Sequence, residues 1–172
     1  MAEEGGLLSF EEWARARTPA LLRSAYLLAG TQHAAEDLVQ STLERVSIAW
    51  RSIDTPDAYS RQVMFRLRAA GWRRRRVHEL LVGSVPETAA PDAGSDTKLV
   101  LARALDRLTL AQRRVLVLRF YEDLPEREVA AVLGCSVGTV KSQTHKALAA
   151  LRRTAPELTD LVGKERPLDV GP

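Results

Sequence analysis

At 172 residues, the chain is long enough for one domain of ordinary size or for two small ones. Hydrophobic residues (45%) permit a packed core, the abundance of Ala, Leu, Arg and Glu predicts an all-helical protein, and the single cysteine excludes an intrachain disulfide and a cysteine-based zinc cluster. The formal net charge is only +3, no run approaches the roughly 20 apolar residues of a membrane helix, and the acidic N-terminus is unlike a signal peptide, so we expect a cytoplasmic protein without membrane insertion.

The first predicted element is a helix that begins just after Ser9. Ser9 and Glu12 have the spacing of a capping box, in which each side chain bonds a backbone donor of the other residue. Thr18-Pro19 predicts an interruption and a new helix with proline in its first position, and Gly30 is predicted to end that helix. The sequence therefore predicts two short helices over residues 10–30.

A further helix is predicted from Ala34 to Trp50, with an apolar side directed at the core. Its other face carries polar residues three and four positions apart, namely Asp37, Gln40, Ser41 and Glu44. This face has two interpretations. It is either an ordinary solvated surface or a docking face for a basic partner.

Turn residues and Pro56 predict a loop from Ser52 to Asp57, followed by a helix that starts near Ala58. Between Arg51 and Arg76 the chain holds eight Arg against two Asp, interleaved with Tyr59, Phe65 and Trp72. Four consecutive Arg at a helix end can be a solvated cap. The interleaved aromatics favour nucleic acid instead, because Arg neutralises phosphates while an aromatic ring stacks on an unpaired base. Of these aromatics, Phe65 is the one expected in the core.

A linker is predicted over residues 81–97, where Pro, Gly, Ala and Ser are frequent and the charges are all negative. It separates a first domain over residues 7–80 from a second over 98–155, and residues 156–172 are expected to be a disordered tail. In the second domain, Thr109 to Gln112 has capping-box spacing and should open a helix that continues to Phe120. The expected fold is all-α, with two small helical domains joined by a flexible linker.

Two helices joined by a tight turn are predicted over Leu124 to Arg152. Gly134 fits the left-handed end of the first helix, and Ser136 can cap the second by accepting from the backbone at Thr139. The second helix has an apolar stripe to bury, comprising Val137, Val140, Thr144, Ala147, Leu148 and Leu151. Its other side carries Gly138, Lys141, Ser142, His145 and Lys146. This is the helix-turn-helix pattern, in which the second helix enters a major groove of DNA; a solvated polar face is the alternative.

Three segments together resemble a known family, the bacterial extracytoplasmic-function (ECF) sigma factors that keep only sigma regions 2 and 4. AEDLVQSTLERV (Ala35 to Val46) is similar to the segment that docks on polymerase, and TPDAYSRQVMFRLRAAGWRRRR (Thr55 to Arg76) to the segment that meets the −10 element. REVAAVLGCSVGTVKS (Arg127 to Ser142) resembles the helix-turn-helix that reads the −35 element. The likeness is strongest to the SigE-like actinobacterial branch.

The resemblance implies an alternative sigma factor that binds core RNA polymerase and directs transcription initiation at promoter DNA. Its partners would be the β′ clamp helices and the β flap of polymerase, and an anti-sigma factor is a further partner common in the family. Polymerase docking would fall to Asp37, Gln40, Ser41 and Glu44. Recognition of −35 would fall to Arg127, Ser136, Gly138, Thr139, Lys141, Ser142, His145 and Lys146. Recognition and melting of −10 would fall to Ser52, Asp54, Asp57, Tyr59, Arg61, Trp72, Arg73, Arg74, Arg75 and Arg76.

The sequence argues against two other functions. A transcriptional regulator of the response-regulator type also carries a helix-turn-helix, but the first half of this chain lacks the alternating βα pattern of a receiver domain. An enzyme is not expected, because His33, His78 and His145 have no ligand spacing and no paired carboxylates or phosphate-cradling glycine loop are present. We therefore expect no catalytic residue, no metal site and no cofactor.

Overall fold

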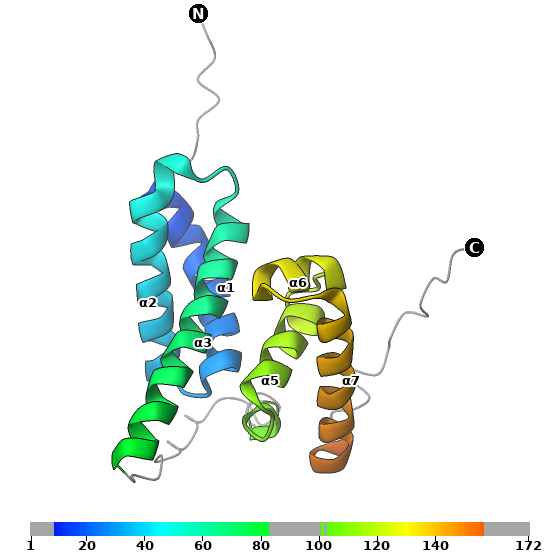
Figure 1. The fold of residues 1–172 in the computed structure, drawn as a ribbon. Helices are drawn as coiled ribbons and strands as arrows, with labels where there is room; N and C mark the ends of the chain where they lie inside the picture. Colours follow the sequence, from blue (N-terminus) through cyan, green and yellow to red (C-terminus); the bar gives the residue numbers. More distant parts are fainter. Residues whose placement is uncertain (1–8, 83–100, 102, 157–172) are drawn as a thin grey trace, which may run out of the picture. The chain divides into compact units, whose positions relative to one another are not determined.

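The computed structural model describes residues 9–82, 101 and 103–156, and for residues 72–82 it describes the helical backbone alone. All regular structure within these residues is helical, which confirms the predicted all-α fold (Figure 1). The chain divides into two compact units, Met1–Ala89 and Ala90–Pro172. The predicted linker beyond Val82 and the predicted tail beyond Pro156 lie outside the described residues.

Three long helices make up the N-terminal unit: α1 (Phe10–Ala29), α2 (Gln32–Ala49) and α3 (Pro56–Val82). Helix α2 packs against both α1 and α3, so the three form a bundle (Figure 1). A short 3₁₀ turn, η1 (Trp50–Ser52), follows α2 at the end of the bundle where α1 begins. The core is apolar, and its members with no exposed surface are Ala25, Leu28, Ala35, Val46 and Phe65. Phe65 is thus the core aromatic that was expected.

Helix α1 runs without interruption through Pro19, so the predicted break at Thr18-Pro19 is wrong. Pro19 is exposed, and its missing N–H removes only one hydrogen bond on the solvent side of the helix. Packing of the opposite side against α2 compensates for that loss, because tertiary contacts supply most of a helix's stability. The two predicted ends are confirmed: the Ser9–Glu12 capping box is formed, and Gly30 closes the helix at φ 86°.

Helix α3 starts at Pro56, two residues before the predicted position. Proline suits the first turn because its missing N–H would have no helical partner there, and the N–H of Tyr59 donates to the Thr55 carbonyl at 3.0 Å. The predicted loop from Ser52 to Asp57 is therefore wrong at both ends. The true connection is residues 53–55, which lie between η1 and α3.

Within the described residues, the C-terminal unit contains three short helical elements before a long one. They are a segment over residues 103–106, α5 (Leu110–Leu116) with the π-helical turn η2 (Val117–Tyr121), and α6 (Glu126–Leu133), and the long helix is α7 (Val137–Thr154). Helices α5 and α6 both pack against α7 (Figure 1). The predicted capping box at Thr109 and Gln112 is confirmed. The helix expected to continue to Phe120 instead widens at Val117, and the Glu122 N–H donates five residues back to the Val117 carbonyl at 2.9 Å.

Buried Arg113 ties the start of this unit to α5. Its Nε donates to the Leu105 carbonyl at 2.9 Å, and a terminal guanidinium nitrogen lies 2.9 Å from an Asp106 carboxylate oxygen. Burial lowers the pKa of Arg113 from its ordinary value, while the charge of Asp106 and its hydrogen bond oppose that effect. The pair therefore holds residues 105–106 on α5 at a site where an unpaired charge would be unfavourable.

Candidate functional site

The helix-turn-helix has the local geometry that the sequence predicts. Helix α6 ends at Gly134, which adopts φ 66°, and the following Cys135 N–H donates to the Ala130 carbonyl at 3.1 Å. Ser136 then caps α7, because its Oγ accepts from the Thr139 N–H at 3.1 Å. Each of the two helices therefore has a defined end, and the turn between them is held by backbone hydrogen bonds.

Helix α7 buries one stripe and exposes another. Val140 and Ala147 have no exposed surface, Leu148 and Leu151 are buried, and the Thr144 hydroxyl donates to the Val140 carbonyl at 2.9 Å. Of the predicted stripe only Val137 is half-exposed. The stripe anchors α7 on α5 and α6, so the opposite face is turned to solvent.

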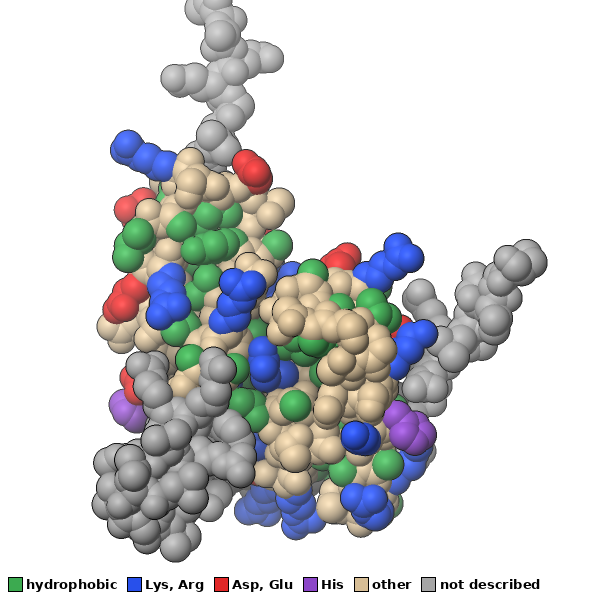
Figure 2. Space-filling view, viewed as in Figure 1, with side chains coloured by type: hydrophobic (Ala, Val, Ile, Leu, Met, Phe, Trp, Pro, Cys, Tyr) green, Lys and Arg blue, Asp and Glu red, His purple; other side chains and the backbone are tan. Residues whose placement is uncertain are grey.

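Seven of the eight residues predicted to read the −35 element lie on α7 or cap it, and the eighth, Arg127, lies on α6. All of them are exposed: Arg127, Ser136, Gly138, Thr139, Lys141, Ser142, His145 and Lys146. Basic side chains and a histidine are visible over α7 in Figure 2. Lys141 Nζ lies 3.8 Å from Glu126 Oε2 of α6, so part of its charge is balanced within the unit. The face offers hydrogen-bond donors and positive charge on a single helix, the chemistry that phosphates and base edges require.

The residues predicted for the −10 element occupy one end of the N-terminal bundle and the length of α3. Ser52 and Asp54 are exposed, whereas Tyr59 and Arg61 are half-buried on α3. The Ser52 hydroxyl donates to the Ala49 carbonyl at 2.8 Å. The backbone of α3 continues through the last five predicted positions, but their side chains lie outside the described part of the chain: Trp72, Arg73, Arg74, Arg75 and Arg76.

Asp57, also predicted for this element, is held by two residues of α1. Its Oδ1 accepts from Trp13 Nε1 at 2.9 Å, and its Oδ2 lies 2.7 Å from an Arg17 guanidinium nitrogen. The Trp13 ring also packs against the rings of Phe10 and Trp50, with centroids 6.2 Å and 5.4 Å away. The sequence gives no local signal for this cluster, because 44 positions separate Trp13 from Asp57.

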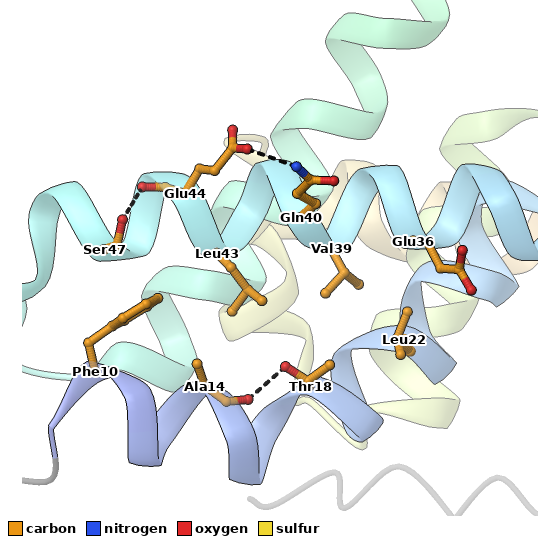
Figure 3. A pocket seen from close by; sticks show the side chains of 10 residues that line it. All are labelled: Phe10, Ala14, Thr18, Leu22, Glu36, Val39, Gln40, Leu43, Glu44 and Ser47. Carbon is orange, nitrogen blue, oxygen red and sulfur yellow. Dashed lines mark hydrogen bonds between the residues drawn. The ribbon is translucent and has the colours of Figure 1, made fainter.

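The polar face of α2 borders an open groove of about 530 Å³ between α1 and α2 (Figure 3). Of the four residues predicted to dock polymerase, Gln40 and Glu44 line this groove and are joined by a 3.3 Å hydrogen bond. Asp37 is exposed and Ser41 half-buried, and neither lines the groove. The sequence interpretation missed the apolar side of the groove, formed by Phe10, Ala14, Leu22, Val39 and Leu43.

The described residues contain no group of three or more His, Cys, Asp or Glu side chains placed to hold a metal ion. In the same part of the chain, no helix has both the length and the apolar character that crossing a membrane requires.

Known proteins similar to this chain are sigma factors of bacterial RNA polymerase. The family model described as Sigma-70, region 4 matches residues 98–151, which include the helix-turn-helix. The RNA polymerase sigma-E factor of Streptomyces coelicolor is 42% identical over 153 residues, covering 86% of this chain and 86% of that protein. The ECF RNA polymerase sigma factor SigL of Mycobacterium tuberculosis is 34% identical, covering 80% of this chain and 84% of its own length.

A solved structure has the same fold. The sigma factor RpoE from Bartonella quintana, solved in complex with the anti-sigma factor NepR, superimposes with a TM-score of 0.72 at 24% identity. The match covers 91% of this chain and 98% of that one. The likeness therefore extends over both helical units.

Proposed function

We propose a division of labour between the two units from one premise: the chain belongs to the ECF RNA polymerase sigma factors, as its relatives at 42% and 34% identity show. It is an alternative sigma factor that directs transcription initiation. In the proposed division, the N-terminal unit binds core polymerase and opens the −10 element, and the C-terminal unit reads the −35 element. The main support for this division is the exposed face of α7. It carries Lys141, Ser142 and Lys146, and it belongs to the C-terminal unit, which is separate from the unit that holds the groove.

The groove between α1 and α2 is the proposed contact with polymerase. Apolar side chains of both helices point into it, and Glu36, Gln40 and Glu44 lie along its α2 side (Figure 3). Glu36 and Glu44 are hydrogen-bonded to the neutral amides of Gln32 and Gln40, which leave their negative charge at the rim of the groove. The groove thus suits a helix that carries an apolar ridge flanked by basic residues. The β′ clamp helices are the proposed occupant.

The −35 element is proposed to bind α7 in its major groove. The N-terminus of α7 is exposed at Ser136, Gly138 and Thr139, where the first backbone N–H groups of the helix and its dipole favour a phosphate. Beyond it, Ser142 and His145 can reach base edges, while Lys141 and Lys146 neutralise phosphates. A good base contact supplies about 1–3 kcal/mol of discrimination, so a single helix of this kind specifies a short element.

The −10 element is proposed to bind the end of the N-terminal bundle. The connection over residues 53–55 is short and exposed at Asp54 and Thr55, which suits it to receive a base turned out of the duplex. Turning out a base costs a few kcal/mol, and the Arg-rich α3 would offset that cost by holding the melted strand. Polymerase would keep the two units at a set spacing, which raises their effective concentration on DNA.

The remaining partners and properties follow from the same premise. We propose that the C-terminal unit also contacts the β flap and that an anti-sigma factor restrains the chain. The fold shared with a sigma factor solved in complex with NepR supports the second point. Polymerase supplies the catalysis in this scheme, so the chain acts by binding alone. Because it binds polymerase, it is proposed to act in the cytoplasm.

Run-off transcription on a genomic fragment library tests the proposal and yields the promoter at the same time. Core polymerase supplemented with the chain is expected to initiate at discrete sites that share two elements, whereas core polymerase alone does not. A transcriptional regulator would instead change the output of a different holoenzyme and would start nothing with core polymerase. The second result would overturn the proposed division.

A further inference from the structure

The connection that is proposed to receive the −10 base is held at both ends by one residue of α1. Residues 53–55 run from η1 to α3, with Trp50 before them and Asp57 two residues after them. The Trp13 ring packs on Trp50 with centroids 5.4 Å apart, and its Nε1 donates to Asp57 at 2.9 Å. Trp13 therefore contacts one residue on each side of the connection.

Trp13 is suited to hold that position because it is itself fixed. Only 6% of its surface is exposed, and its ring contacts Phe10 as well as Trp50. A buried indole N–H requires an acceptor, and Asp57 Oδ1 is the acceptor it has. The hydrogen bond consequently fixes the first turn of α3 relative to α1, and not merely the ring.

Asp57 is exposed, yet both of its oxygens are engaged. The side chain is 48% exposed, with Trp13 on Oδ1 and Arg17 at 2.7 Å from Oδ2. An unpaired carboxylate here would repel the phosphates of a strand approaching the connection, and Arg17 balances that charge. These contacts favour a role for Asp57 inside the protein over a direct contact with DNA.

We propose that Trp13 and Arg17, acting through Asp57, are positioning residues that set the conformation of residues 53–55 for −10 recognition. The inference rests on the proposed function, because it assumes that this connection receives the −10 base. It assigns specificity to a helix outside the DNA-facing segments. A purely structural role is the alternative, in which the cluster only stabilises the packing of α1 on α3.

The two roles differ in their effect on the preference for the correct base at each −10 position, so this preference is the quantity to measure. Trp13→Phe keeps an aromatic ring and removes the N–H donor, and Asp57→Ala removes both contacts. Arg15→Ala, an exposed residue of the same helix, is the matched control. For each variant with core polymerase, open-complex formation is measured on the promoter from the run-off assay, on fragments with each −10 base replaced, and on fragments with each −35 base replaced.

The positioning role predicts that Trp13→Phe and Asp57→Ala lower the preference for the correct −10 base by about two- to tenfold, the scale of one net hydrogen bond. The preference at −35 stays unchanged in both, and Arg15→Ala matches the unmodified chain. A purely structural role lowers open-complex formation on all fragments by the same factor and leaves the −10 preference intact. That result overturns the inference.

The unmodified chain separates failure of this inference from failure of the proposed function. If it shows no −10 preference with polymerase, the proposed function is wrong; if it discriminates and the variants discriminate equally, only the positioning role is wrong. Thermal unfolding identifies a variant that fails to fold. In that case Arg17→Ala replaces the unfolded variant in the test, because the Arg17 side chain is 43% exposed. The positioning role predicts a smaller loss of −10 preference in this variant, and an unchanged preference overturns the inference.

Discussion

The two helical units prepare their nucleic-acid surfaces in different ways. In the C-terminal unit, the exposed face of α7 is set by contacts close in sequence. Gly134 ends α6, and Ser136 caps α7 by accepting from the Thr139 N–H three positions later. In the N-terminal unit, the end of the bundle is set by Trp13 and Asp57, which are 44 positions apart. A surface on one regular helix needs only its caps and a buried stripe, whereas an irregular connection depends on a neighbouring helix.

Because each unit builds its surface from its own residues, we expect a core substitution in one unit to lower the free energy of unfolding of that unit only. Phe65 has no exposed surface in the N-terminal unit, so Phe65→Ala is expected to lower that unit's free energy of unfolding by about 3–5 kcal/mol. All three Trp residues lie within the first 89 positions, so Trp fluorescence in urea reports the N-terminal unit alone.

Leu118→Ala is the matched change in the C-terminal unit, where Leu118 also has no exposed surface. It is expected to cost about 2–5 kcal/mol and to shift the circular dichroism transition of that unit while the Trp transition keeps its midpoint. A Trp transition that moves equally in both variants would show one cooperative structure and contradict the contrast.

Docking on the β′ clamp helices should depend on the groove of the N-terminal unit. Asp37→Arg combined with Gln40→Ala reverses a charge and removes a groove-lining amide, so we expect the affinity for core polymerase to fall about tenfold or more in a co-purification titration. Binding of a −35 duplex should be unchanged. Arg45→Ala, exposed on the same helix and outside the groove, is the control. Loss of helical circular dichroism in the double variant would mean that this face belongs to the core.

Two glycines, one in each unit, should respond to alanine with opposite signs. Gly134 sits at φ +66° and has open space where the Cβ of an alanine would lie, so Gly134→Ala should destabilise the C-terminal unit by about 1–2 kcal/mol through backbone strain alone. Gly71 lies inside α3 and also has open space, so Gly71→Ala should stabilise the N-terminal unit by about 0.5–1 kcal/mol. Urea unfolding measures both. A Gly134→Ala variant as stable as the unmodified chain, or more stable, would refute the assignment of Gly134 as a left-handed helix end.

The smallest expected effect distinguishes the two lysines of α7. Lys146→Ala should reduce the slope of log affinity against log salt by about 0.9 for a −35 duplex, the value for one phosphate contact. Lys141→Ala should reduce it less, because Glu126 lies 3.8 Å from its ammonium group and balances part of the charge. Fluorescence anisotropy across a salt series measures both slopes, and two unchanged slopes would exclude direct phosphate contact.

The sequence predicted the features whose causes are local. The capping boxes at Ser9 and Thr109, the helix ends at Gly30 and Gly134 and the cap at Ser136 were all found from spacing, because each depends on residues within four positions. The buried and exposed sides of α7 followed from helical periodicity for the same reason.

Features decided by tertiary contacts were missed. Local rules predict a break at Pro19, but packing on α2 keeps α1 continuous. The π-helical turn at Val117 has no turn residue to mark it. The groove beside Gln40 and the cluster of Trp13 with Asp57 both need α1 to be placed against other helices before they exist. The groove and the cluster are the parts of the N-terminal unit on which the proposed polymerase contact and the further inference depend.

Permanganate footprinting of the promoter with core polymerase and the full chain tests the division of labour most directly. Reactive thymines are expected at the −10 element only when both proteins are present. A −35 substitution should lower the intensity of all reactive thymines equally, and a −10 substitution should change which of them react. Reactive thymines with polymerase alone, or a duplex that stays closed in the complete mixture, would show that the two units do not share promoter recognition and opening as proposed.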